Sequence, residues 1–161
     1  MSEALEKSKI CVSFDYDHDK RYYYLLEAWN TNPNINFWVE DCTPREIQSE
    51  SVPKIKQVLS TKIGTAECMV AIIGEHSTER HPDCVQIGYN NWQCYEIAKN
   101  HEKGNGLVVV RLDRSYSVPS ECYGIGASWV SGFSLDAIKK ELDRQCRSAV
   151  FKLLEYCTPE W

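Results

Sequence analysis

Short runs of consecutive apolar residues alternate with amphipathic segments along this chain. Consecutive apolar residues are typical of strands that are buried on both faces, as the strands of a parallel sheet are. In the segments between them, apolar residues recur three or four positions apart, which is the spacing of one helix face. The pattern predicts an α/β domain with a parallel sheet and helices on both of its faces. The expected strands are residues 9–14, 35–39, 67–74, 107–112 and a short edge strand at 127–130.

Capping residues indicate where the helices begin. Asp17 or Asp19 is expected to cap the helix after the first strand, and Asn90 or Asn91 the helix after the third strand. Further helices are expected at residues 51–63 and 134–157.

Polar and aromatic residues follow the expected strands. Parallel α/β sheets bind ligands at the carboxyl ends of their strands. We therefore expect a binding site at this edge of the sheet. The strand ends are Phe14-Asp15, Trp38 to Asp41, Gly74 to His76, and Asp113.

A tryptophan and a glutamate lie four positions apart in the helix that is expected to begin at this edge. The spacing of Trp92 and Glu96 places both side chains on one helix face. A carboxylate in an aromatic cleft can act on a sugar or on a neighbouring cation. The same spacing is also found in ordinary amphipathic helices, where the tryptophan is buried and the glutamate solvated.

Length, charge and hydropathy narrow the classes of protein. The chain has 161 residues and a net charge of −5, which predicts a single domain without a broad basic surface for nucleic acid. No apolar run approaches the roughly 18 residues of a membrane-spanning helix, and the first residues are too charged for a signal peptide. We expect a cytoplasmic protein that binds neither membrane nor nucleic acid.

The cysteines do not form a recognisable metal or disulfide pattern. No two of the 8 cysteines are three residues apart. Cys11, Cys68 and Cys94 lie within apolar patterns, where free cysteine behaves as a small hydrophobic residue. We expect reduced thiols.

The histidines and the acidic residues after the first strand do not complete a metal site either. The four histidines show no ligand spacing. Residues 15, 17 and 19 are aspartates and resemble the acidic pocket of a response regulator, but Gly74-Glu75 stands where that pocket needs an aspartate. No bound metal is expected.

Three segments together resemble a known family. With the expected fold order, residues 10–17, 72–74 and 91–96 make the chain similar to TIR-like domains, and most narrowly to the ThsB subunit family of the bacterial Thoeris antiphage system. The likeness extends over about residues 8–133. It implies a flavodoxin-like, five-stranded parallel sheet and one TIR-like domain over residues 1–161, with the last helix at 134–157.

The resemblance also implies an activity. Such an enzyme consumes NAD as a substrate, without a cofactor, and breaks the bond between nicotinamide and ribose. It makes a cyclic ADP-ribose isomer or a related ADP-ribose product, which activates a partner effector protein. TIR enzymes often assemble, so a homo-oligomer is expected. The resemblance places the catalytic glutamate at Glu96, and the expected substrate-binding residues are Phe14, Asp15, Asp17, Trp38, Gly74, His76 and Trp92.

Two other functions remain open. The first is a catalytically silent TIR-like module for interaction or nucleotide sensing, and the second is an enzyme like the nucleoside deoxyribosyltransferases, which have a related fold and a catalytic carboxylate. Glu96 favours an enzyme over the silent module. Residues 75–90, which include His76 and His81, are expected to form a loop, and the family resemblance assigns no role to it.

Overall fold

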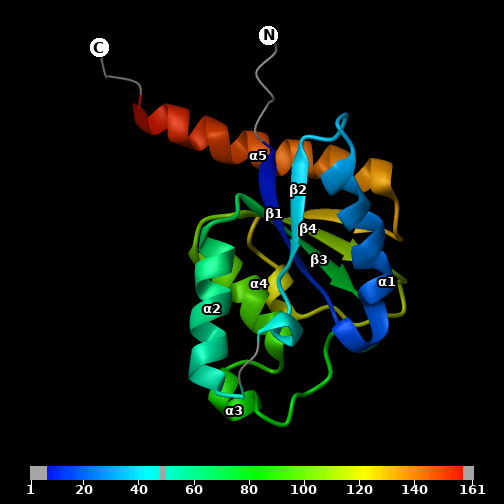
Figure 1. The fold of residues 1–161 in the computed structure, drawn as a ribbon, viewed down its shortest axis with the longest axis vertical. Coiled ribbons are helices and arrows are strands. Elements are labelled where there is room, and N and C mark those ends of the chain that lie inside the picture. The colour runs from blue at the N-terminus through cyan, green and yellow to red at the C-terminus, as the bar shows by residue number, and fades with distance from the viewer. Residues whose placement is uncertain (1–6, 48–49, 158–161) are drawn as a thin grey trace.

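A five-stranded parallel sheet forms the centre of the molecule. The computed structural model describes residues 7–47 and 50–157. The strands lie in the order β2-β1-β3-β4-β5, and each pairs with its neighbours in parallel (Figure 1). This confirms the expected flavodoxin-like α/β fold. The strands are β1 (Ser8–Ser13), β2 (Phe37–Asp41), β3 (Cys68–Ile73), β4 (Gly106–Arg111) and β5 (Ser128–Ser131).

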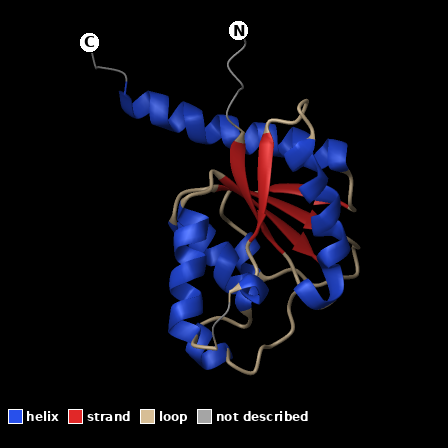
Figure 2. Cartoon of the chain, in the orientation of Figure 1, coloured by secondary structure: helices blue, strands red, loops and turns tan. Residues whose placement is uncertain are grey.

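Helices cover both faces of this sheet (Figure 2). On one face, α1 (Tyr16–Glu27) and α5 (Leu135–Cys157) contribute to a core with the strands. On the other face, α2 (Val52–Gly64), α4 (Trp92–Glu102) and the short α3 (Cys84–Ile87) do the same. The 3-10 turns are η1 (Ala28–Thr31), η2 (Pro44–Glu46) and η3 (Ser120–Cys122).

The two cores follow from the alternation of side chains along each strand. In β1, Ile10 and Val12 pack in the core that contains Leu26 of α1, whereas Cys11 packs in the core that contains Leu59 of α2. All residues of β3 are buried, as the central strand of a doubly covered sheet requires. Continuous apolar runs were therefore a sound predictor of the inner strands.

Two helices begin at the carboxyl edge of the sheet, and one of their caps differs from expectation. Asn91 caps α4 as predicted, and its side chain accepts a hydrogen bond from the Cys94 N–H. The cap of α1 is Asp15, which accepts from the Asp17 N–H, so the prediction of Asp17 or Asp19 was wrong. The chain turns directly from β1 into α1, and only Asp15 keeps the extended backbone that an N-cap needs.

Most of the cysteines whose side chains the structure describes lie in the interior of the molecule. The seven cysteines whose side chains the structure describes are free, and Cys11, Cys68 and Cys94 are buried. No helix in that part has the length and hydropathy needed to cross a bilayer.

Candidate active site

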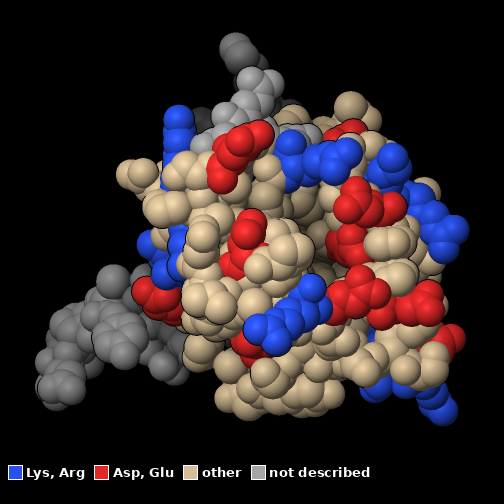
Figure 3. Space-filling view, turned by 90° about the horizontal axis from the view of Figure 1, so that it is seen from below, with Lys and Arg blue, Asp and Glu red and all other residues tan. Residues whose placement is uncertain are grey.

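A cleft lies at the carboxyl edge of the sheet. Its volume is about 460 Å³, and its walls come from the segments after β1, β2 and β3 and from the first turns of α4. Seen from below, this end of the molecule carries both acidic and basic side chains (Figure 3). The lining residues are Phe14 to His18, Thr43 to Arg45, His76, Ser77, Glu79 to Pro82, Asn91 to Gln93, and Glu96.

Glu96 contributes a buried carboxyl group to this cleft. It lies in the second turn of α4 and is 1% exposed. Its Oε1 accepts a hydrogen bond from the Oγ of Ser13, the last residue of β1, at 2.7 Å. Burial raises the pKa of Glu96 well above the usual range; the Ser13 hydrogen bond opposes this rise, and the nearby Asp41 adds to it. Burial in this cleft therefore disfavours the charged form of Glu96.

Gln93 joins α4 to the ends of two strands. Its Nε2 donates to the main-chain oxygen of Ile72 at 2.8 Å and to that of Ser13 at 3.2 Å. Its Oε1 is buried and has no hydrogen-bond partner among the described residues. Gln93 and Glu96 are three positions apart on α4, so both side chains lie on the same face of this helix.

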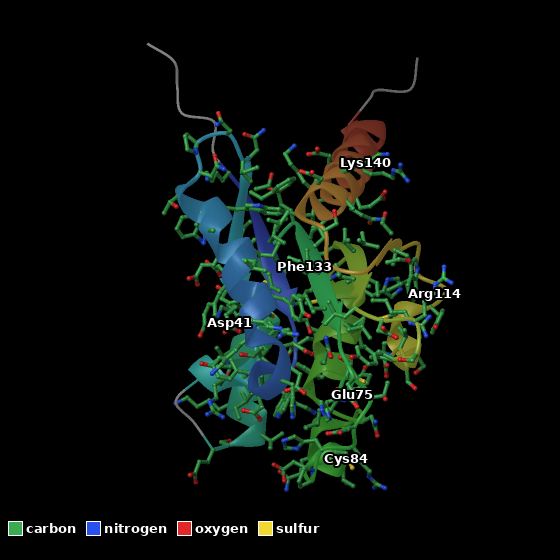
Figure 4. All side chains as sticks on the ribbon, turned by 90° about the vertical axis from the view of Figure 1, so that its right-hand side faces the viewer. Asp41, Glu75, Cys84, Arg114, Phe133 and Lys140 are labelled. Carbon is green, nitrogen blue, oxygen red and sulfur yellow. The ribbon has the colours of Figure 1, made fainter. Side chains whose placement is uncertain are left out.

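The loop between β3 and α4 forms one wall and is tied to α4 by Asn91. The side-chain oxygen of Asn91 caps the helix, and the Nδ2 of Asn91 donates to the carbonyl oxygens of Ser77 at 2.8 Å and Glu79 at 2.9 Å. In Figure 4 the labelled Glu75, which follows β3, and Cys84, the first residue of α3, show where the segment between β3 and α4 lies in the lower part of the molecule. The loop that had no assigned role is thus a structural part of the cleft.

Two histidines stack at the cleft. The ring centroids of His18 in α1 and His76 in the β3–α4 loop are 3.7 Å apart, with 23° between the planes. The Nδ1 of His18 lies 2.7 Å from Asp15 Oδ2, and the Nδ1 of His76 is hydrogen-bonded to Glu79. The Glu79 hydrogen bond raises the pKa of His76. The stack brings α1 and the loop together.

The aromatic residues of the cleft differ in exposure. Trp92 is partly buried, and its ring makes edge contacts with His81 at 6.4 Å and Tyr95 at 5.7 Å. Phe14 also lines the cleft, but it is 3% exposed and its ring stacks on Tyr23 at 5.1 Å. Phe14 is therefore mainly a core residue, and Trp92 is the aromatic side chain with more surface available to a ligand.

The structure brings most, but not all, of the expected site residues together. Gly74 does not line the cleft; it supports the loop through its N–H, which donates to Ser77 Oγ at 2.9 Å. The placement of Trp38 in the site was wrong. It is the second residue of β2 and is 44% exposed, away from the carboxyl end of that strand. The expected residues that do line the cleft are Phe14, Asp15, Asp17, His76, Trp92 and Glu96.

The aspartates after β1 have separate structural roles. Asp15 caps α1, and Asp17 pairs with Arg45 at 3.4 Å across the cleft. Asp19 is buried against Gly74, where an added Cβ would lie 2.1 Å from Asp19 Oδ2. Within the described residues, no group of three or more His, Cys, Asp or Glu side chains is arranged to hold a metal ion.

Sequence reasoning missed Ser13, Gln93 and His18. Gln93 could have been found, because it is one helical turn before Glu96 on the same face. Ser13 is the polar last residue of an apolar strand, but it is 83 positions from Glu96 in the chain. The pairing of His18 with His76 has no local signal.

Comparison with solved structures places the fold among known α/β proteins. It is similar to a 2-deoxyribosyltransferase from Bacillus psychrosaccharolyticus, with a TM-score of 0.53 and 12% identity over 82% of this chain and 90% of that one. It is also similar to a 2-deoxyribosyltransferase from Leishmania mexicana, with a TM-score of 0.50 and 13% identity over 87% and 97% of the two chains. At these identities the likeness shows the fold alone. A search of curated proteins gave no match.

The fold and the cleft together define a flavodoxin-like α/β domain with a buried carboxyl group at the ligand-binding edge of its sheet. The family described as Thoeris protein ThsB, TIR-like domain, matches residues 11–117. This match covers more than half of the chain, and the chain belongs to that family. Membership supports a TIR-like role in Thoeris defence.

Proposed function

We propose that this chain cleaves the bond between nicotinamide and ribose in NAD. The product is a cyclic ADP-ribose isomer or a related ADP-ribose compound, and it activates a partner effector. The family match supports the defence role. The observation that carries the proposed chemistry is the burial of Glu96 in a cleft at the carboxyl edge of the sheet.

One carboxylate suffices for this reaction. Nicotinamide leaves NAD as a neutral molecule from a cationic ring, so its departure needs no general acid, unlike the leaving groups of ordinary glycosidases. Positive charge develops on the ribose in the transition state. A carboxylate held in a site of low polarity stabilises that charge electrostatically. In the proposal, this carboxylate is Glu96.

The raised pKa of Glu96 is compatible with a cationic substrate. Without a ligand, burial favours the neutral acid. The positive nicotinamide ring favours the carboxylate when it binds nearby, so substrate binding lowers the pKa of Glu96 and releases its proton. Ser13, which already donates to Oε1, helps to hold the ionised form.

The cleft walls exclude water from the reacting centre in this proposal. Trp92 and the β3–α4 loop border the same cleft as Glu96. Less water around a cationic intermediate favours attack from within the substrate over hydrolysis.

A glycosyl transfer between nucleosides is the second candidate. Its support is the fold shared with two 2-deoxyribosyltransferases. The two functions differ in what they release: the first liberates nicotinamide from NAD without an acceptor base, and the second exchanges one base for another on a deoxyribonucleoside.

The test measures by chromatography whether the purified protein releases nicotinamide from NAD. It is run at several protein concentrations, because TIR enzymes often need assembly. Glu96→Gln should reduce the rate about 10²-fold or more, since it removes the charge and keeps the shape. Glu102→Gln is the matched control: Glu102 lies on the same helix, is exposed and pairs with Lys99 at 2.8 Å. Near wild-type release by folded Glu96→Gln protein would contradict the role of Glu96.

A further inference from the structure

The side-chain amide of Gln93 has a defined orientation. One end faces the main-chain oxygens of Ile72 and Ser13. Carbonyl oxygens only accept hydrogen bonds, so the end of the amide that faces them must be the NH₂ group. The other end of the amide is then the acceptor Oε1, and the two hydrogen bonds of the NH₂ group fix its orientation.

No donor among the described residues reaches this acceptor. Gln93 is 6% exposed, and its Oε1 is shielded from water without a hydrogen-bond partner among the described residues. Native proteins rarely leave a buried acceptor unpaired, because nothing then offsets its loss of water. Since Gln93 lines the cleft, a bound ligand can supply the missing donor.

Gln93 also stands next to the proposed catalytic group. Gln93 and Glu96 lie on one face of α4 and line the same cleft. The nearby hydroxyl of Ser13 already donates to Glu96. The two neighbouring side chains therefore present acceptors, which suit a ligand with two adjacent donors. The vicinal hydroxyls of a ribose have that arrangement.

We propose that Gln93 selects ribosyl over deoxyribosyl ligands: its Oε1 accepts a hydrogen bond from one hydroxyl of the ribose diol, while Glu96 accepts from the neighbouring hydroxyl. The inference rests on the proposed function in placing Glu96 at the ribose. It concerns the sugar and not the base, so it can be tested with ligands that lack nicotinamide.

The experiment measures the binding of ADP-ribose and of two analogues that lack the 2- or the 3-hydroxyl of the terminal ribose, by calorimetry. Wild-type protein should bind ADP-ribose about tenfold more tightly than each analogue, the effect of one neutral hydrogen bond or more. Gln93→Met keeps the length of the side chain and removes both ends of the amide. It should lose the discrimination against one of the analogues and keep it against the other.

Asn100→Leu is the matched control. Asn100 is buried on the same helix, its Nδ2 donates to the Gly106 oxygen at 3.1 Å, and its Oδ1 also lacks a partner among the described residues. It does not line the cleft. This variant should lose comparable stability but keep both discriminations. If Gln93→Met does not fold, Gln93→Lys replaces it, because lysine can donate to the two carbonyl oxygens and has no acceptor.

The outcomes separate this inference from the proposed function. Wild-type protein that binds none of the three ligands, or binds them equally, overturns the inference, as does a folded Gln93 variant with both discriminations intact. A protein that loses one discrimination with Gln93 but releases no nicotinamide from NAD supports the inference and contradicts the proposed function. If the wild-type protein releases nicotinamide from NAD but the Gln93 variant still discriminates against both analogues, the proposed function is supported and the inference about Gln93 is contradicted.

Discussion

The ionisable side chain of Glu96 is almost completely buried. Its pKa is raised in the folded protein, mainly by burial. The folded state therefore binds a proton at pH values where the unfolded chain has lost it. The stability gained from this proton is fully present below the unfolded pKa, about 4.3 for glutamate, and is lost as the pH rises through the folded pKa.

The loss of stability with rising pH can be measured by comparison with a variant that does not ionise. Glutamine does not ionise, so Glu96→Gln should be more stable than wild-type protein at high pH, and the difference should shrink as the pH falls. The measurement is the Tm of both proteins across a pH series by circular dichroism, with Glu102→Gln as the exposed control. A difference that stays constant or grows toward low pH would argue against the burial effect.

Ser13 should tune the ionisation of Glu96. Its hydroxyl favours the carboxylate, so Ser13→Ala should raise the pKa of Glu96 further. For the proposed reaction, kcat/KM should fall roughly tenfold at neutral pH, and its pH profile should move to higher pH. In a Glu96→Gln background, Ser13→Ala should leave the pH profile unchanged. An amplitude loss without a shifted profile would indicate a merely structural role for Ser13.

For single residues, the sequence predicted the contacts between positions that are close together in the chain. Trp92 and Glu96 are one helical turn apart, so their shared face can be deduced from spacing. The contact between Ser13 and Glu96 depends on how β1 approaches α4, which no local pattern encodes. The burial of Phe14 likewise depends on the tertiary contact with Tyr23 of α1, whose ring stacks on it. Phe14→Ala would therefore remove core packing as well as any shielding of the substrate.

Among the elements, the N-terminus of α4 connects the helix to the wall of the cleft. Asn91 uses its oxygen as the helix cap and its amide nitrogen to hold the β3–α4 loop. The two roles can be separated by substitution. Aspartate retains the capping oxygen but cannot donate, whereas alanine loses both groups.

We expect Asn91→Asp to keep α4 intact and loosen the loop. Asn91→Ala should in addition lose about 1 kcal/mol of stability with the cap. Hydrogen exchange of the segment from Ser77 to Glu79 measures the loop, and thermal unfolding measures the helix. If the loop is protected equally in wild-type and Asn91→Asp protein, Asn91 does not hold this wall.

The boundaries of elements explain the remaining differences from expectation. The second strand was expected at 35–39, but β2 is Phe37–Asp41. Its last residues, Glu40 and Asp41, are charged, so the apolar pattern ended before the strand did. This shift placed Trp38 at a strand end in the prediction and near the strand start in the structure. α3 is a single short turn and was not expected from the pattern.

For the whole molecule, the alternating pattern was sufficient to predict a parallel sheet covered on both faces. The pattern did not show which loops meet at the carboxyl edge. The cleft depends on tertiary pairs such as His18 with His76 and Asp17 with Arg45, which join segments that are separate in the chain.

The dispersal of the aspartates after β1 leads to a prediction about metals. Asp15, Asp17 and Asp19 have different neighbours and do not converge on one point. NAD cleavage should therefore continue at an unchanged rate in EDTA, with and without added magnesium. Loss of nicotinamide release in EDTA, followed by recovery with magnesium, would require these residues to be reconsidered as a metal site.

The burial of Glu96 has a consequence for a cell that carries this protein. NAD serves many reactions, so an enzyme that consumed it continuously would harm its host in the absence of a phage. In the structure the carboxyl group is 1% exposed, and its raised pKa favours the neutral acid. Under the proposed function, burial opposes the charged form of Glu96 until a cationic substrate lies beside it, and this restrains the loss of NAD while the protein accumulates in an uninfected cell.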